Sequence, residues 1–287
     1  MAHSSAWPPT SDSFTKHASA PGEDLRCEAC ALRWLGEAEG EGGISVARMM
    51  GVNRDQLSEE RVRQVPPSRE GARQVGRALA HMHAAGAPWW GCPPQGWDFA
   101  WGDAYVLQQS RIPVVCRDGA PDTWGAFYAE YRVRAFAKQA RDEGELDAAD
   151  VRQIEKLCVR LERGDFDAPQ PALVEQCIAS SNGAVACARL HGDLWAGNVL
   201  YDDSATGATL IDPLAHGGHA ETDLAMLQLF GFPYLDDVLA AYDEVSPLAD
   251  GWRDRVPLHQ LAPLLHHVVL YGGPYVASAL RVVRRYV

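Results

Sequence analysis

The segment from His191 to Asp212 constrains the fold of this 287-residue chain more than any other part. It begins HGDLWAGNVL and, after the polar run DDSATG, ends in LIDP. Because Asp, Ser and Gly between two short apolar stretches favour a turn, we predict a β-hairpin here. Asp193 and Asn198 precede the hairpin five positions apart, and Asp212 follows 14 positions later. The hairpin would therefore bring three oxygen-bearing side chains together at one end.

These three side chains suit the transfer of a phosphoryl group from ATP. Such a reaction needs a carboxylate that orients the attacking hydroxyl and accepts its proton, and oxygen ligands that hold Mg²⁺ against the phosphates. The order H-x-D-x-x-x-x-N, hairpin, Asp is the one that protein kinases use. We interpret Asp193 as the candidate base and Asn198 and Asp212 as candidate Mg²⁺ ligands. The alternative is that all three only cap and stabilise turns.

Composition excludes several other classes of protein. The chain has 38 acidic and 26 basic residues, a net charge of −12, whereas an electrostatic nucleic-acid binder has the opposite balance. No window approaches the ~18 apolar residues of a membrane span, and the first residues do not form a signal peptide. Seven irregularly spaced cysteines favour reduced thiols over a disulfide framework. We therefore expect a cytoplasmic protein with no nucleic-acid or membrane partner.

The pattern along the chain predicts an α+β protein with two unequal parts. Residues 1–66 read as a small mixed part, with a strand ending at Lys16, a helix over 22–35 and two extended stretches. Pro66 and Pro67 mark a boundary. Residues 67–287 read as mostly helical, with helices that begin after Ser68 and near Thr123 and with an irregular loop over 87–121.

The quoted motifs resemble those of one family. LHGDLWAGNVL followed by LIDPLAHGGHAETDLAMLQLFG is similar to the fructosamine kinase (ketosamine 3-kinase) family, as are TWGAFYAEYRV and AYDEVSPLADGWRDRVPLHQL. This family shares the protein-kinase-like fold with aminoglycoside phosphotransferases. The resemblance implies ATP- and Mg²⁺-dependent phosphorylation of a fructosamine or ribulosamine on the sugar 3-hydroxyl. Such phosphates are unstable and release the amine, so the implied role is deglycation of proteins or metabolites.

The resemblance also implies a role for individual residues. Asp193 matches the catalytic base, and Asn198 and Asp212 match the metal ligands. The others fall into groups. One group is implied to contact the nucleotide, directly or through the lysine–glutamate pair: Lys16, Glu28, Glu60 and Val62. Candidates for lining the substrate site are Trp195, His216, His219 and Glu221. Asp223 is implied to bond to the backbone of the catalytic loop, a structural role.

The start of the sequence departs from the family pattern. Two strands and a glycine-containing turn should precede the lysine strand and cover the phosphates, but only 15 residues precede Lys16 and none of them is glycine. We therefore expect a truncated N-terminal lobe, and we favour a start upstream of the printed sequence over a true loss of this lid.

Two other functions remain open on the sequence. A non-catalytic, pseudokinase-like binding protein is favoured by the missing lid and disfavoured by the five retained site residues. A phosphotransferase acting on an aminoglycoside or another amino sugar would keep the chemistry and change the acceptor. The net charge suits a cationic ketosamine and a cationic amino sugar alike, so it does not discriminate between these acceptors.

Overall fold

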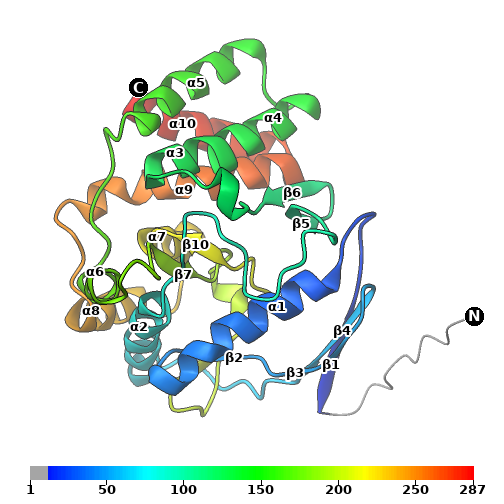
Figure 1. Cartoon of the computed structure of the whole chain (residues 1–287), viewed down its shortest axis with the longest axis vertical. Helices are drawn as coiled ribbons and strands as arrows, with labels where there is room; N and C mark the ends of the chain where they lie inside the picture. The colour runs from blue at the N-terminus through cyan, green and yellow to red at the C-terminus, as the bar shows by residue number, and fades with distance from the viewer. Residues whose placement is uncertain (1–11) are drawn as a thin grey trace, which may run out of the picture.

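A small antiparallel sheet and one helix form the N-terminal part of the computed structural model, which describes residues 12–287 (Figure 1). Its elements are β1 (Ser13–His17), α1 (Leu25–Gly36), β2 (Ser45–Val46), β3 (Met49–Val52) and β4 (Gln56–Glu60). The strand order is β1–β4–β3, and Lys16 on β1 lies opposite Leu57 on β4. Helix α1 begins at the N-cap Asp24 and buries Leu32 and Leu35. Lys16 and Glu28 come from β1 and α1 respectively, so this packing decides whether they meet.

The larger part is mainly helical. Its helices are α2 (Arg69–Ala84), α3 (Trp124–Tyr128), α4 (Ala135–Asp142), α5 (Ala148–Glu162), α6 (Ala172–Ser180), α7 (Glu221–Leu229), α8 (Leu235–Val245), α9 (Trp252–Tyr271) and α10 (Val276–Tyr286). Its strands are β5 (Ala104–Leu107), β6 (Ser110–Pro113), β7 (Ala188–Leu190), β8 (Val199–Tyr201), β9 (Ala208–Leu210) and β10 (His216–Gly218). A π-helical stretch, Ala129–Arg134, joins α3 to α4. In Figure 1, α3, α4, α5, α9 and α10 gather at the end of the molecule opposite β1, β3 and β4.

Several predicted elements are present with their predicted caps. The side chain of Ser68 accepts a hydrogen bond from the backbone N–H of Gly71 at the start of α2, and Thr123 does the same for Ala126 at the start of α3. Such a cap stabilises a helix by about 1 kcal/mol. The hairpin predicted around DDSATG is the antiparallel pair β8–β9. One expectation was wrong: the segment 87–121 contains the β5–β6 hairpin, in which Tyr105 lies opposite Ile112.

The two parts are joined by more than the linker at Pro66 and Pro67. Strand β2 pairs in parallel with β9, with Val46 beside Leu210. One cluster of buried side chains also extends from Leu32 on α1 to Val283 on α10. The sheet that carries Lys16 is therefore held against the hairpin that carries Asp212. The division at residue 66 stays a prediction.

None of the helices in residues 12–287 combines the length and the apolar character that a membrane span requires.

Candidate active site

The loop between β7 and β8 carries Asp193 and is held in place by hydrogen bonds to the side chain of Asp223. The buried Asp223 carboxylate accepts hydrogen bonds from the backbone N–H groups of His191 (2.7 Å) and Gly192 (3.0 Å), and it lies 3.2 Å from His83 Nε2. The family resemblance implied bonds of this kind from Asp223 to the loop. Gly192 has a φ of +84°, and a Cβ there would lie 2.2 Å from the carbonyl oxygen of Leu214. Only glycine fits this turn without moving the backbone.

Asp193 and Asn198 contact each other directly. The Asn198 Nδ2 group donates to the backbone oxygen of Asp193 (2.9 Å) and to its Oδ2 (3.0 Å). With both amide hydrogens engaged in this way, the Oδ1 atom of Asn198 is left as an acceptor or ligand. Burial raises the pKa of Asp193 to about 6, the bond from Asn198 opposes this, and nearby Asp212 adds to it. A carboxylate of this pKa is ionised at neutral pH but can accept a proton, which suits a general base.

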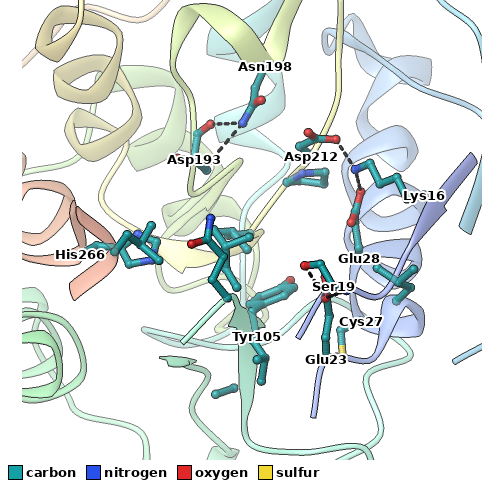
Figure 2. A pocket seen from close by; sticks show the side chains of 18 of the residues that line it. Lys16, Ser19, Glu23, Cys27, Glu28, Tyr105, Asp193, Asn198, Asp212 and His266 are labelled. Atoms are coloured by element: carbon teal, nitrogen blue, oxygen red, sulfur yellow. Dashed lines mark hydrogen bonds and ion pairs between the residues drawn. The ribbon is translucent and has the colours of Figure 1, made fainter. Parts of the chain in front are cut away.

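Lys16, Glu28 and Asp212 form one connected group (Figure 2). The Lys16 ammonium donates to a carboxylate oxygen of Glu28 and to Oδ1 of Asp212. Burial alone would lower the pKa of Lys16, but Glu28, Asp212 and Glu59 outweigh burial and raise it. Asp212 has a φ of +55°, and its side chain is 44% exposed. A non-glycine residue in this backbone region is strained, a feature that clusters at functional sites.

Glu59 is a member of this group that the sequence analysis missed. Its carboxylate is 3% exposed and lies 3.9 Å from the Lys16 ammonium. Burial raises the pKa of Glu59 to about 8, Lys16 opposes the rise, and Glu28 adds to it. The run QLSEE alone does not distinguish Glu59 from Glu60. Only the register, which puts Phe14 opposite Glu59, places Glu59 on the same strand face as Lys16.

These residues line one cleft of about 780 Å³ between the two parts of the molecule. Of the predicted site residues, it brings together Lys16, Glu28, Asp193, Trp195, Asn198 and Asp212. Trp195 is 41% exposed, and its ring covers Gly197, where a Cβ would lie 2.3 Å from the ring. The far wall comes from elements that the sequence analysis did not connect to the site, including Tyr105 on β5 and His266 on α9 (Figure 2).

Glu60 and Val62 are not among the residues that line this cleft. They border a separate hollow with Arg48, Arg61 and the β8–β9 turn. Glu60 follows Glu59 on β4, so its side chain points to the opposite face of the sheet, where it pairs with Arg48 at 3.2 Å. The expectation that Glu60 and Val62 contact the nucleotide through the cleft therefore has no support in this geometry.

The three other substrate candidates separate into two groups. His216 and His219 line a small second cavity beside Asp193, and burial is the main reason that their pKa values fall, to about 3 and about 4. Both imidazoles are therefore neutral at physiological pH. Glu221 lines neither cavity. Its two carboxylate oxygens accept hydrogen bonds from Arg255 on α9, at 2.9 Å from Nε and 2.5 Å from Nη2. We therefore assign Glu221 to holding α7 against α9 and not to the substrate.

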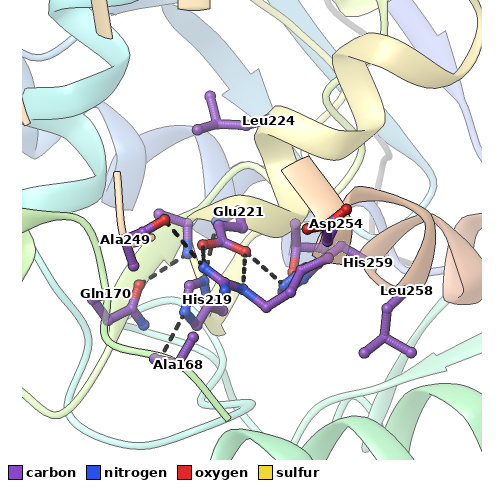
Figure 3. Close-up of polar contacts among 12 residues, drawn as sticks. Ala168, Gln170, His219, Glu221, Leu224, Ala249, Asp254, Leu258 and His259 are labelled. Atoms are coloured by element: carbon purple, nitrogen blue, oxygen red, sulfur yellow. Dashed lines mark hydrogen bonds and ion pairs between the residues drawn. The ribbon is translucent and has the colours of Figure 1, made fainter. Parts of the chain in front are cut away.

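Glu221 also belongs to a cluster that resembles a metal site. Ligand atoms of His219, Glu221 and His259 lie within 4.8 Å of one another (Figure 3). The ring nitrogens of His219 are, however, engaged by the carbonyl of Ala168 and the N–H of Glu221. Because Arg255 already holds both oxygens of Glu221, the cluster forms a hydrogen-bonded connection between helices and not an open metal centre.

Comparison with known proteins tests the family resemblance. The model of the fructosamine kinase family matches residues 61–287. The chain belongs to the fructosamine kinase family. It is 30% identical over 221 residues to the chloroplastic protein-ribulosamine 3-kinase of Arabidopsis thaliana. This alignment covers 76% of this chain and 58% of that protein. The family resemblance inferred from the motifs is thus confirmed.

Solved structures agree with the fold. A Thermobifida fusca protein described as a candidate fructosamine-3-kinase superposes with a TM-score of 0.77 at 41% identity, over 95% of this chain and 84% of that one. An ADP-bound aminoglycoside phosphotransferase superposes with a TM-score of 0.53 at 10% identity, over 96% of this chain and 95% of that one. At such low identity the second match shows the fold alone. The protein-kinase-like α+β fold is therefore confirmed.

The chain matches only part of its curated relatives. Over matches of 207 residues or more, it spans between 58% and 65% of their length.

Proposed function

We propose that this protein transfers the γ-phosphoryl group of ATP to the 3-hydroxyl of a ketosamine, such as a fructosamine or a ribulosamine. One observation carries the proposal: Asp193, Asn198, Asp212 and the Lys16–Glu28 pair line a single cleft in a member of the fructosamine kinase family. A binding protein without catalysis would have no physical need for this whole set. The aminoglycoside phosphotransferases give no support for a different acceptor, because at about 10% identity they share only the fold.

In the proposed reaction Asp193 acts on the sugar hydroxyl. Its carboxylate orients the hydroxyl and takes the proton as the oxygen attacks the γ-phosphorus. The new bond from oxygen to phosphorus forms while the bond to the bridging oxygen of ADP breaks, and ADP leaves. The hydrogen bond from Asn198 fixes the carboxylate at 3.0 Å, so little reorientation is needed. Because the pKa of Asp193 is about 6, it is mostly ionised at pH 7 and ready to accept the proton.

The donor set of the cleft fits Mg²⁺. Asp212 offers a half-exposed carboxylate and Asn198 an amide oxygen, and Mg²⁺ binds hard oxygen ligands of this kind together with substrate phosphates. When bound, the ion would neutralise charge on the phosphates. Lys16 would turn its ammonium from Asp212 toward the phosphates, with Glu28 holding its position. Asp212 would then be free to serve as a ligand.

We place the reaction in the cytoplasm. All seven cysteines are free thiols, which supports a reducing compartment. Release of the amine from the 3-phosphate would make the reaction a step of deglycation.

The test is an acceptor panel with the whole chain. The protein is incubated with Mg-ATP and with fructosyl-lysine, ribulosyl-lysine or kanamycin, and ADP release is measured beside reactions without acceptor. ³¹P NMR identifies any phosphate monoester. We expect ADP release with a ketosamine and the signal of a secondary sugar phosphate. If only kanamycin is phosphorylated, the acceptor is an aminoglycoside and not a ketosamine. If no acceptor is phosphorylated, a binding protein is favoured.

A further inference from the structure

Arg132 is a buried cation that forms no ion pair with a carboxylate in the described part of the chain. It lies in the π-helical stretch between α3 and α4 and is 5% exposed. Its Nη1 donates to the backbone oxygens of Pro113 (2.8 Å) and Tyr131 (2.9 Å), and the guanidinium lies 4.8 Å from the ring centre of Phe127. Within residues 12–287, its Nη2 has no hydrogen-bond partner. An unpaired buried charge is costly, so such a group calls for a counter-ion.

Arg132 borders the small cavity beside the catalytic loop. This cavity has a volume of about 50 Å³, room for a group of a few heavy atoms. It shares four lining residues with the large cleft, namely Asp193, Leu214, His266 and His267. The two spaces therefore adjoin at the candidate base. His266 adds a second polar atom, because its Nε2 is also buried without a partner among the described residues.

The cavity lies on the acceptor side of the site and not on the nucleotide side. Lys16 and Glu28 line the cleft but not the cavity, whereas Arg132 lines the cavity but not the cleft. In Figure 2, His266 and Lys16 occupy opposite sides of the pocket, with Asp193 between them. A group bound by Arg132 would thus approach Asp193 from the side away from the phosphates.

The surroundings of Arg132 favour an anion. Of the residues from 12 to 287 that line the cavity, Asp193 is the one with a carboxylate. The pKa of His216 falls to about 3 through burial and then through Arg132, and that of His266 falls to about 3 through burial, His267 and Arg132. His219 and His267 also line the cavity, and burial lowers the pKa of both, so all four imidazoles are neutral at neutral pH. Among the described residues that line the cavity, Arg132 is therefore the single positive charge. Burial lowers the pKa of Arg132 to about 10, which leaves it charged at neutral pH.

We propose that the acceptor carries an anionic group, a carboxylate or a phosphate, which Arg132 binds while the reacting hydroxyl faces Asp193. This inference rests on the proposed function and narrows its substrate class. The anion has two possible sources: the carboxylate of an amino acid joined to the sugar through its amine, or a phosphate at the far end of the sugar. Arginine suits both, because either oxyanion can accept charge-assisted hydrogen bonds from the unpartnered Nη2 of Arg132. A π-helical turn is a frequent location for functional side chains.

The first experiment uses the unmodified protein and matched acceptors. Fructosyl-glycine is compared with fructosyl-glycinamide, which lacks only the charge, and fructosyl-methylamine is compared with its 6-phosphate. In at least one pair, we expect kcat/KM to be roughly 10- to 100-fold higher for the anion, the range of charge-assisted hydrogen bonds. The pair that responds identifies the source. Equal kcat/KM within both pairs would overturn the proposal.

The same pairs separate this inference from the proposed function. If no acceptor is phosphorylated, the kinase assignment fails, and calorimetric binding of the two pairs still measures the preference for an anion. Tighter binding of an anionic member then supports the Arg132 site, and equal binding refutes it.

Variants of Arg132 complete the test. In Arg132→Met, the ratio of kcat/KM between the anionic and neutral members should fall to about one, and Arg132→Lys should keep part of it. Arg134→Met is the matched control, because Arg134 lies two residues away and pairs with Glu155 and Glu162 outside the cavity. If circular dichroism shows that Arg132→Met is not folded, the lysine variant and the matched acceptors test the role of Arg132 instead. An undiminished ratio in a folded Arg132→Met protein would refute the role of this side chain.

Discussion

Replacing Asp193 by Asn tests the base with the least change of shape. The Asn198 Nδ2 group donates to Oδ2 of Asp193 at 3.0 Å, and the carbonyl oxygen of an asparagine can accept the same bond. The loop should therefore keep its conformation while losing its proton acceptor. Positioned general bases contribute roughly 10²- to 10⁴-fold, so we expect kcat to fall by this factor, equivalent to about 3–5 kcal/mol in the barrier.

The pKa of Asp193 adds two further readouts. In the unmodified protein, kcat/KM should fall about tenfold per pH unit below the pKa of about 6, because the base must be ionised. The folded pKa also lies above the ordinary value, so ionised Asp193 reduces stability as the pH rises from about 4 through 6. Asp193→Asn removes this cost, so its melting temperature at pH 7 should not be lower than that of the unmodified protein.

The assay measures ketosamine-dependent ADP release from pH 5 to 8, with melting temperature as the check on folding. Asp165→Asn is the matched control, because this carboxylate pairs with Arg160 at 2.8 Å on the surface. The control should retain full activity. A folded Asp193→Asn protein with near-normal kcat would refute the reasoning, and so would an equal loss in the control.

Three further substitutions test the metal ligand, the support of the loop and the missed carboxylate. Asp212→Asn keeps a side chain that tolerates positive φ but removes the charge, so kcat should fall by roughly 10² or more and added Mg²⁺ should rescue it poorly; an unchanged Mg²⁺ titration would contradict this. Asp223→Ala leaves the N–H groups of His191 and Gly192 without an acceptor, so the free energy of unfolding in urea should drop by about 3–5 kcal/mol; a loss below about 1 kcal/mol would show that the support is dispensable. Glu59 has a folded pKa of about 8, above its ordinary value, so it favours the folded state at low pH and this stabilisation is lost as the pH rises toward 8. Glu59→Gln should flatten that fall between pH 5 and 8, and an identical pH profile would count against the buried position of Glu59.

Features that depend on local sequence were predictable. The offset from Asp193 to Asn198 and the turn residues of DDSATG are properties of one short segment, and the hairpin formed as expected. The helix starts at Ser68 and Thr123 also follow from single capping residues. The contact between Lys16 and Glu28 was expected only from the family resemblance, because no local sequence pattern relates a strand lysine to a helix glutamate.

Features that depend on register and long-range packing were not predictable. The parallel pair β2–β9 joins segments more than 160 residues apart, and no residue in either segment indicates that the two strands pair. The β5–β6 hairpin lies in a stretch rich in Trp, Gly and Pro, a composition that favours an irregular loop. Glu59 and Arg132 are charged residues that sequence reasoning assigns to the surface by default. Only tertiary structure shows that both are buried beside the site.

The charge of the whole chain is a poor guide to the acceptor, because the two sides of Asp193 differ in sign. On the nucleotide side, the carboxyl groups of Glu28, Glu59 and Asp212 surround Lys16, and bound Mg²⁺ would balance the negative charge that this group carries. On the acceptor side, the described residues of the cavity lining include one charged base, Arg132, among neutral histidines. A net charge of −12 would favour a cationic acceptor at long range. Salt screens that field within about 8–10 Å, whereas a buried guanidinium acts at hydrogen-bond distance. The acceptor should therefore be selected by the cavity next to Asp193, and its affinity should respond little to added salt.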